Sequence, residues 1–181
     1  LQPLPAIKNA QHTLNATDLT TASPAAPTAG VFISMRPQQA RLLLPQMKIA
    51  GYGHVPVFAT SHVYTGSTNS GLDRDLNGVQ FCDIPWLFDT TPGLPNHNEI
   101  ARSMDSARNG GARLFALGLD AYALLPYLDG LVQEHDKYLS GATGQLTADP
   151  DGRIQRQLIW AQFDNGVAHP INGELSANPE E

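Results

Sequence analysis

The stretch TGQLTADPDGRIQRQLIWAQFDNG, residues 143–166, has the clearest local pattern in the chain. It predicts a β-hairpin with a short strand over residues 145–147 and a long second strand over residues 153–163. The turn between them is Asp149-Pro150-Asp151-Gly152, where proline presets φ and glycine is free to take a positive φ. Residues 167–171 follow a second tight turn and are expected to pair back on the long strand.

The second half of the long strand is apolar on both faces. Alternation puts Leu158 and Trp160 on one face, and Ile159, Ala161 and Phe163 on the other. A strand that is buried on both faces belongs inside a sheet covered by helices. We therefore expect Trp160 to lie in the interior.

From Gly30 onward, strand and helix patterns alternate. Strands are predicted over residues 31–35, 55–60 and 79–84, joined by a helix that begins at Pro37 and by a polar loop over residues 61–77. A further helix begins near residue 96 or 98 and ends at Gly110-Gly111, and residues 113–133 form one amphipathic helix. This alternation is typical of a parallel sheet with right-handed crossovers.

Four separated segments resemble one known family. They are ATSHVYTG (59–66), DRDLNGVQFCDIPWLF (73–88), RLFALGLDAY (113–122) and RQLIWAQFDNG (156–166). Together they resemble the LpoA/LppC family of outer-membrane lipoproteins, which activate penicillin-binding proteins. The match extends from about Gly30 to Pro170, and no catalytic signature comes with it.

The resemblance implies an α/β fold of the periplasmic-binding-protein type I kind, with a parallel sheet flanked by helices. The chain would supply mainly the second lobe plus a C-terminal β-hairpin. The helix over residues 113–133 would belong to the other lobe, and the hairpin would return to the lobe that holds residues 30–88. The first lobe's own strands would precede Leu1, so the chain resembles the C-terminal part of a larger domain.

Composition divides the chain into three parts. Residues 1–29 contain four prolines and a tract rich in Thr, Ala and Ser, a linker-like composition that predicts poor order. Residues 30–173 form the domain, and residues 174–181 form a tail. The formal charge of −6 and the pI of 5.4 argue against binding to nucleic acid, which requires clustered Lys and Arg.

The sequence has no apolar run of transmembrane length. The only cysteine, Cys82, lies in a predicted core strand and is expected to be an inert buried thiol. By resemblance, the full-length protein would be periplasmic and anchored to the outer membrane. Contact with the membrane would be made only through a lipid anchor outside this chain.

The chemistry-bearing motifs are few, and no cofactor is expected. Asp73 to Gly78 begins like a calcium-binding loop, but Ile84 stands where the twelfth-position Glu is required, so no metal is predicted. The six histidines show no spacing typical of a zinc site. Because no nucleophile, base and orienting group are recognisable together, an enzyme is not expected.

Four of the five ligand-binding candidates follow predicted strands, where ligands approach the carboxyl ends of a parallel sheet, and Asp120 lies on the helix predicted over residues 113–133. The candidates are Ser61, His62, Tyr64, Trp86 and Asp120. Each also has a structural interpretation. His62 could be hydrogen-bonded in a loop, and Trp86 could be a core anchor. Asp120 must be paired or exposed, because an unpaired buried carboxylate is costly.

Two functions follow. The resemblance implies a non-catalytic periplasmic regulator that stimulates a peptidoglycan synthase, a penicillin-binding protein, through protein contact. The alternative is a periplasmic receptor for an amino-acid-like small molecule bound in the interlobe cleft. The leucines of residues 113–133 also need cover, which predicts a homodimer or a retained fragment of the missing part of the domain.

Overall fold

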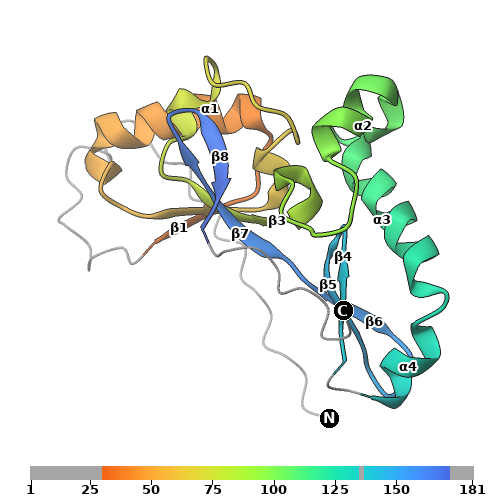
Figure 1. The fold of residues 1–181 in the computed structure, drawn as a ribbon. Coiled ribbons are helices and arrows are strands. Elements are labelled where there is room, and N and C mark those ends of the chain that lie inside the picture. The colour runs from red at the N-terminus through yellow and green to blue at the C-terminus, as the bar shows by residue number, and fades with distance from the viewer. Residues whose placement is uncertain (1–29, 135–136, 172–181) are drawn as a thin grey trace, which may run out of the picture.

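The computed structural model describes residues 30–134 and 137–171, which form two sheets and a row of helices (Figure 1). The larger sheet has the strand order β1-β2-β3-β7-β8. Its strands are β1 (Val31–Ile33), β2 (Val57–Ala59), β3 (Gln80–Asp83), β7 (Ile159–Asp164) and β8 (Val167–Pro170). The first three strands are parallel, and β7 and β8 add to them in antiparallel fashion. The predicted parallel sheet and the returning strand β8 are thus both present.

The smaller sheet is antiparallel and has the order β4-β5-β6. It consists of β4 (Leu139–Gly141), β5 (Gly144–Ala148) and β6 (Ile154–Gln157). The sequence patterns did not predict β4, which is only three residues long. A separate apolar cluster of Leu131, Leu139, Leu146 and Ala148 packs this sheet against α4.

Four α-helices accompany the sheets in the described ranges. They are α1 (Pro37–Met47), α2 (His97–Ser103), α3 (Gly111–Leu124) and α4 (Leu128–Gln133). Helix α1 begins at Pro37, as predicted, and continues into a π-helical turn, Lys48–Tyr52, in which Gly51 takes a φ of 89°. Helix α1 lies over one face of the larger sheet, whereas α3 and α4 run alongside the smaller sheet (Figure 1).

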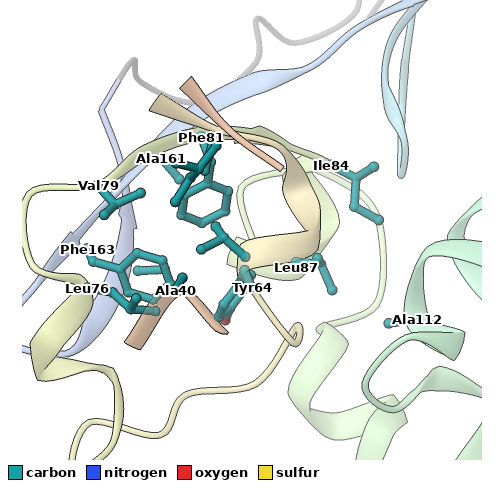
Figure 2. Packing of buried hydrophobic residues seen from close by; sticks show 14 of the residues in the cluster. Ala40, Tyr64, Leu76, Val79, Phe81, Ile84, Leu87, Ala112, Ala161 and Phe163 are labelled. Atoms are coloured by element: carbon teal, nitrogen blue, oxygen red, sulfur yellow. The ribbon is translucent and has the colours of Figure 1, made fainter. Parts of the chain in front are cut away.

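The main core lies between α1 and the larger sheet. Figure 2 shows Phe81, Phe163, Leu76 and Val79 gathered there, with Ala40 of α1 packed against them. Phe81 and Phe163 are buried because β3 and β7 present every second residue to the helix-covered face.

The long strand predicted over residues 153–163 is wrong, because the chain changes sheets at Leu158. Strand β6 pairs with β5, with Gln157 opposite Gln145. Strand β7 pairs with β3, with Ile159 opposite Asp83. Every residue of β6 is exposed, whereas alternate residues of β7 are buried. The hairpin therefore returns to the first sheet only from Ile159 onward.

The single helix predicted over residues 113–133 is also wrong, because it is broken between α3 and α4. Pro126 has no N–H to donate to the carbonyl of Tyr122. Two hydrogen bonds that span three residues instead of four replace the α-helical pattern there. Leu125 N–H donates to Tyr122 O at 3.4 Å, and Tyr127 N–H donates to Leu124 O at 3.0 Å. Upstream, the helix predicted to reach residues 110–111 ends at Ser103, because Met104 is extended.

The interior position predicted for Trp160 is wrong. Trp160 is 38% exposed, and it points away from α1 together with Phe58, whose ring it meets edge-on at 6.1 Å. Cys82 pairs opposite Trp160 in the register and is only partly buried, so its expected burial is wrong as well. No helix among residues 30–134 and 137–171 covers this side of the sheet (Figure 1).

The predicted linker, residues 1–29, lies outside the described residues, as does the predicted tail, residues 174–181.

Candidate functional site

The carboxyl ends of β2 and β3 lie side by side, and Arg113 from α3 reaches into them. We call Ser61, Tyr64, Asp83 and Arg113 the strand-end cluster. Arg113 Nε donates to Asp83 Oδ1 at 2.9 Å, and Nη2 forms an ion pair with Asp83 Oδ2. Arg113 Nη2 also donates to the backbone carbonyls of Ser61 and Tyr64, each at 3.1 Å. One guanidinium therefore joins the ends of two strands to the first turn of α3.

The electrostatics of the cluster are dominated by the burial of Asp83, whose side chain is 1% exposed. Burial raises the pKa of Asp83, and the hydrogen bonds from Arg113 and from the N–H of Ile84 oppose that rise. The charge of His62 also lowers the pKa of Asp83, as that of Arg113 does. The carboxyl group is thus held in a dry position by partners from its own chain.

Tyr64 lies at the inner side of the cluster and is buried. Its ring stacks on Phe88 at 5.7 Å and meets Phe163 edge-on at 6.0 Å. Burial raises the pKa of Tyr64 to about 12, with a smaller opposing effect from the hydrogen bond to Thr68. The phenol is therefore part of the aromatic core rather than a surface group.

Trp86 is buried at 1% exposure, and its indole N–H donates to the carbonyl of Pro95 at 2.8 Å. Its ring stacks on Phe115 at 5.4 Å and meets His97 edge-on at 4.8 Å. Of the two interpretations given for Trp86, the structure favours the core anchor. The residue links the turn Pro85–Phe88 to α3.

Asp120 lies on α3, is buried, and has three donors. The N–H groups of Ala142 and Thr143 donate to its two oxygens at 2.6 and 2.7 Å, and the hydroxyl of Thr143 donates at 2.5 Å. The expectation that Asp120 is paired or exposed is confirmed, since the carboxylate is paired with the turn between β4 and β5. A Cβ at Gly141 would lie 2.7 Å from Asp120 Oδ1, so this close approach requires glycine.

The five predicted ligand-binding residues therefore do not form one open pocket. Ser61 and Tyr64 meet at Arg113, and His62 beside them is exposed, while Trp86 and Asp120 lie at other contacts of α3. A ligand-binding role for the five stays a prediction. Arg113, the residue that organises the cluster, was not among the candidates. A buried aspartate ending an apolar strand was the available signal, because such a group needs a cation.

Within residues 30–134 and 137–171, no group of three or more His, Cys, Asp or Glu side chains is arranged to hold a metal ion. In the calcium-loop-like segment, Asp73 instead accepts from Arg41 Nη2 at 2.7 Å and from Nε at 3.0 Å. None of the described helices has the length and apolar character needed to cross a membrane. A cavity of about 420 Å³ lies at the opposite ends of β2 and β3, with Lys48, Tyr52 and His54 in its wall.

Comparison with known families and proteins gives one consistent result. The family model described as "LppC putative lipoprotein" matches residues 6–166. A penicillin-binding protein activator LpoA from Haemophilus influenzae is 34% identical over 124 residues, covering 65% of this chain and 20% of the relative. The LpoA of Pectobacterium parmentieri is 30% identical over 143 residues, covering 78% of this chain and 21% of the relative. The chain thus spans about a fifth of the length of these curated relatives.

Solved structures agree with this grouping. The C-domain of LpoA from Haemophilus influenzae, described as a regulator of PBP1A, superposes with a TM-score of 0.67 at 26% identity. That match covers 86% of this chain and 48% of the C-domain. The structure described as "a putative branched-chain amino acid ABC transporter" from Chromobacterium violaceum gives a TM-score of 0.52 at 29% identity, covering 75% of this chain and 42% of that one. The architecture is therefore that of periplasmic-binding-protein type I-like proteins.

Proposed function

Because the chain belongs to the LppC family, we propose that it is part of a non-catalytic regulator that stimulates a penicillin-binding protein through direct protein contact. The observation that carries this proposal is the superposition on the LpoA C-domain, a regulator of PBP1A, over 86% of the chain. A synthase of the PBP1A kind is the corresponding partner. The protein would be periplasmic and held at the outer membrane by a lipid anchor outside this chain.

The polar groups of the candidate site support a non-catalytic role. Asp83 is engaged by Arg113, and Asp120 is engaged by Ala142 and Thr143, so neither carboxylate is placed to act on a substrate. The buried hydrogen bonds of Asp83, His97 and Asp120 do not join a nucleophile to both a base and an orienting group. These buried polar contacts instead connect elements of the fold.

The test is a binding and activity assay with a purified PBP1A-type synthase. We expect saturable binding of the complete protein in biolayer interferometry, and an increase in the peptide cross-linking rate of the synthase. An amino-acid-binding protein of the same fold is the matched control, since it shares the architecture but not the family. Absence of both binding and stimulation by the complete protein would refute the proposal.

The second candidate is a receptor for an amino-acid-like small molecule. It is favoured by the fold shared with the Chromobacterium violaceum protein and by the exposed His62 beside the strand ends. Thermal-shift screening against amino acids and cell-wall fragments would reveal a saturable ligand. A ligand whose effect is lost in His62→Ala would favour the receptor, whereas an empty screen together with synthase binding would favour the regulator.

Helix α3 supports the further proposal that the chain associates through this helix. Leu114 is 72% exposed, Leu117 is 51% exposed and Leu128 of α4 is 39% exposed. Leu119 and Leu124 are partly buried, and Leu131 is buried. Such apolar surface is stabilised by contact with a second copy or with a retained part of the domain. Sedimentation at micromolar concentration distinguishes a dimer or a complex with a retained fragment from a single chain. Observation of a single unassociated chain would refute the proposal.

A further inference from the structure

We propose that the carboxyl ends of β2 and β3 form a guanidinium-binding site, and that Arg113 of the same chain fills it and so fastens α3 to the larger sheet. This inference is independent of whether the protein activates a synthase. It assigns a ligand class to the strand ends and names their resident occupant.

The first support is the set of acceptors. Both oxygens of Asp83 face the guanidinium, one bonded to Nε and the other to Nη2. This is the side-on, two-bond arrangement in which a guanidinium fits a carboxylate. The carbonyls of Ser61 and Tyr64 lie at 3.1 Å from Nη2 and accept from the same nitrogen. An ammonium group has a single nitrogen, so it has no counterpart of the Nε donor and cannot pair side-on with Asp83 through two nitrogens.

The second support is burial. The Asp83 side chain is 1% exposed, whereas that of Arg113 is 25% exposed. The acidic partner is therefore built into the sheet, and the cation reaches it from the solvent side. Withdrawal of Arg113 would leave a buried carboxylate without a counter-ion, which is strongly unfavourable. The strand ends consequently require a cation in place, and the chain supplies one from its own helix.

The third support is the position of Arg113 on α3. Asp120, seven residues later on the same helix, binds the N–H groups of Ala142 and Thr143 between β4 and β5. One end of α3 is thus fastened to the larger sheet and its middle to the smaller sheet. Both fastenings are charge-assisted, the one at Asp120 buried and the one at Arg113 partly buried, so α3 sets the relative position of the two sheets. A free ligand could enter the strand ends only by displacing Arg113, which is a reason to prefer the regulator over the receptor.

Chemical rescue tests the site directly in the 181-residue chain. Arg113→Ala removes the occupant and leaves the acceptors, and it should lower Tm by something on the order of 10 °C. Ethylguanidinium chloride should then raise Tm again. At about ten times its Kd, the ion should increase the ratio of folded to unfolded chain about tenfold. Sodium chloride and ethylammonium chloride at equal ionic strength should not raise the Tm of Arg113→Ala.

Arg108→Ala is the matched control. Arg108 also donates to backbone carbonyls, those of Ala101 and Arg102, and pairs with Asp105, but on the surface. Ethylguanidinium should give this variant no increase in Tm. An equal increase in both variants, or an equal increase from sodium chloride, would overturn the proposal.

Two further outcomes decide the matter if Arg113→Ala does not fold. Recovery of a native circular-dichroism spectrum on adding ethylguanidinium would support a guanidinium site, and no recovery would overturn it. Arg113→Lys keeps the charge but loses the planar donors, so it should remain well below the parent in Tm. A lysine variant as stable as the parent would show that the site selects only positive charge, which would overturn the assignment of ligand class.

Discussion

The two faces of the larger sheet are built from the same strands and have opposite surroundings. On the α1 face, Phe81, Ala161 and Phe163 are fully or almost fully buried. On the other face, Trp160 and Phe32 are exposed, although Trp160 directly precedes Ala161 on β7 and Phe32 directly precedes the buried Ile33 on β1. The difference is not one of residue type, because both faces carry large aromatic side chains.

The comparison shows that alternation assigns a side chain to a face but does not say what covers the face. Helix α1 and the turn Asp73–Leu76 pack on one side, and no described element packs on the other. Aromatic side chains on an open sheet face are typical of a surface that another part of a protein covers. We therefore expect substitutions on the buried face to cost much more stability than substitutions on the open face.

The largest effect is expected for Phe163→Ala. Phe163 is 1% exposed and contacts Phe81 at a ring distance of 5.2 Å, so truncation leaves a cavity in the main core. The free energy of unfolding should fall by about 3 to 5 kcal/mol, as measured by urea denaturation. A loss of less than about 1 kcal/mol would mean that the buried face does not carry the stability assigned to it.

The next effect is specific to alkaline pH. Burial raises the pKa of Tyr64 to about 12 in the folded chain, against about 10 for an ordinary tyrosine. A raised folded pKa gives a contribution that is fully present below pH 10 and is lost as pH rises through 12. The loss amounts to about 2 to 3 kcal/mol.

The Tyr64→Phe variant should therefore lose less stability between pH 10 and pH 12 than the parent does. Denaturation at a series of pH values measures this difference. Tyr122→Phe, at a tyrosine that is 80% exposed, is the control and should follow the parent curve. Identical curves for Tyr64→Phe and the parent would show that the phenol ionises without cost in the folded chain.

Local sequence patterns predicted a large part of the fold. The strands at β1, β2 and β3 and the start of α1 at Pro37 followed from short apolar runs and from proline at a first helical position. The break at Pro126 also had a local signal, which the strong leucine spacing around it outweighed. The change of sheets at Leu158 had no local signal. It is set by the pairing of β6 with β5 and of β7 with β3, and β3 is distant in the sequence.

The candidate site was less predictable than the fold. Ser61 and Tyr64 were identified because ligands approach strand ends, but their carbonyls, not their side chains, make the contact with Arg113. A backbone acceptor leaves no trace in residue type. The pairing of Asp83 with Arg113 joins residues thirty positions apart, so it becomes visible only once α3 lies against the sheet.

A smaller effect is expected for Trp160→Ala on the open face. Trp160 is 38% exposed and makes an edge-on contact with Phe58, so truncation removes this contact and part of its buried area. We expect a loss of about 1 to 2 kcal/mol in urea denaturation, clearly below that of Phe163→Ala. A loss equal to that of Phe163→Ala would show that the open face is covered in solution.

The smallest effect is expected for Phe32→Ser, which tests whether the open face is open in solution. Phe32 is 69% exposed and lies on β1, at the edge of the sheet, so its side chain gains little from folding. The change in the free energy of unfolding should stay within about 0.5 kcal/mol. Leu42→Ser is the matched control, because Leu42 has the same 69% exposure but lies on α1.

If Phe32→Ser costs well over 1 kcal/mol while Leu42→Ser is neutral, something outside the described residues covers this face. Repeating the measurement at several protein concentrations then separates the sources of cover: a cost that rises with concentration indicates a second copy, and a constant cost indicates another part of the same chain.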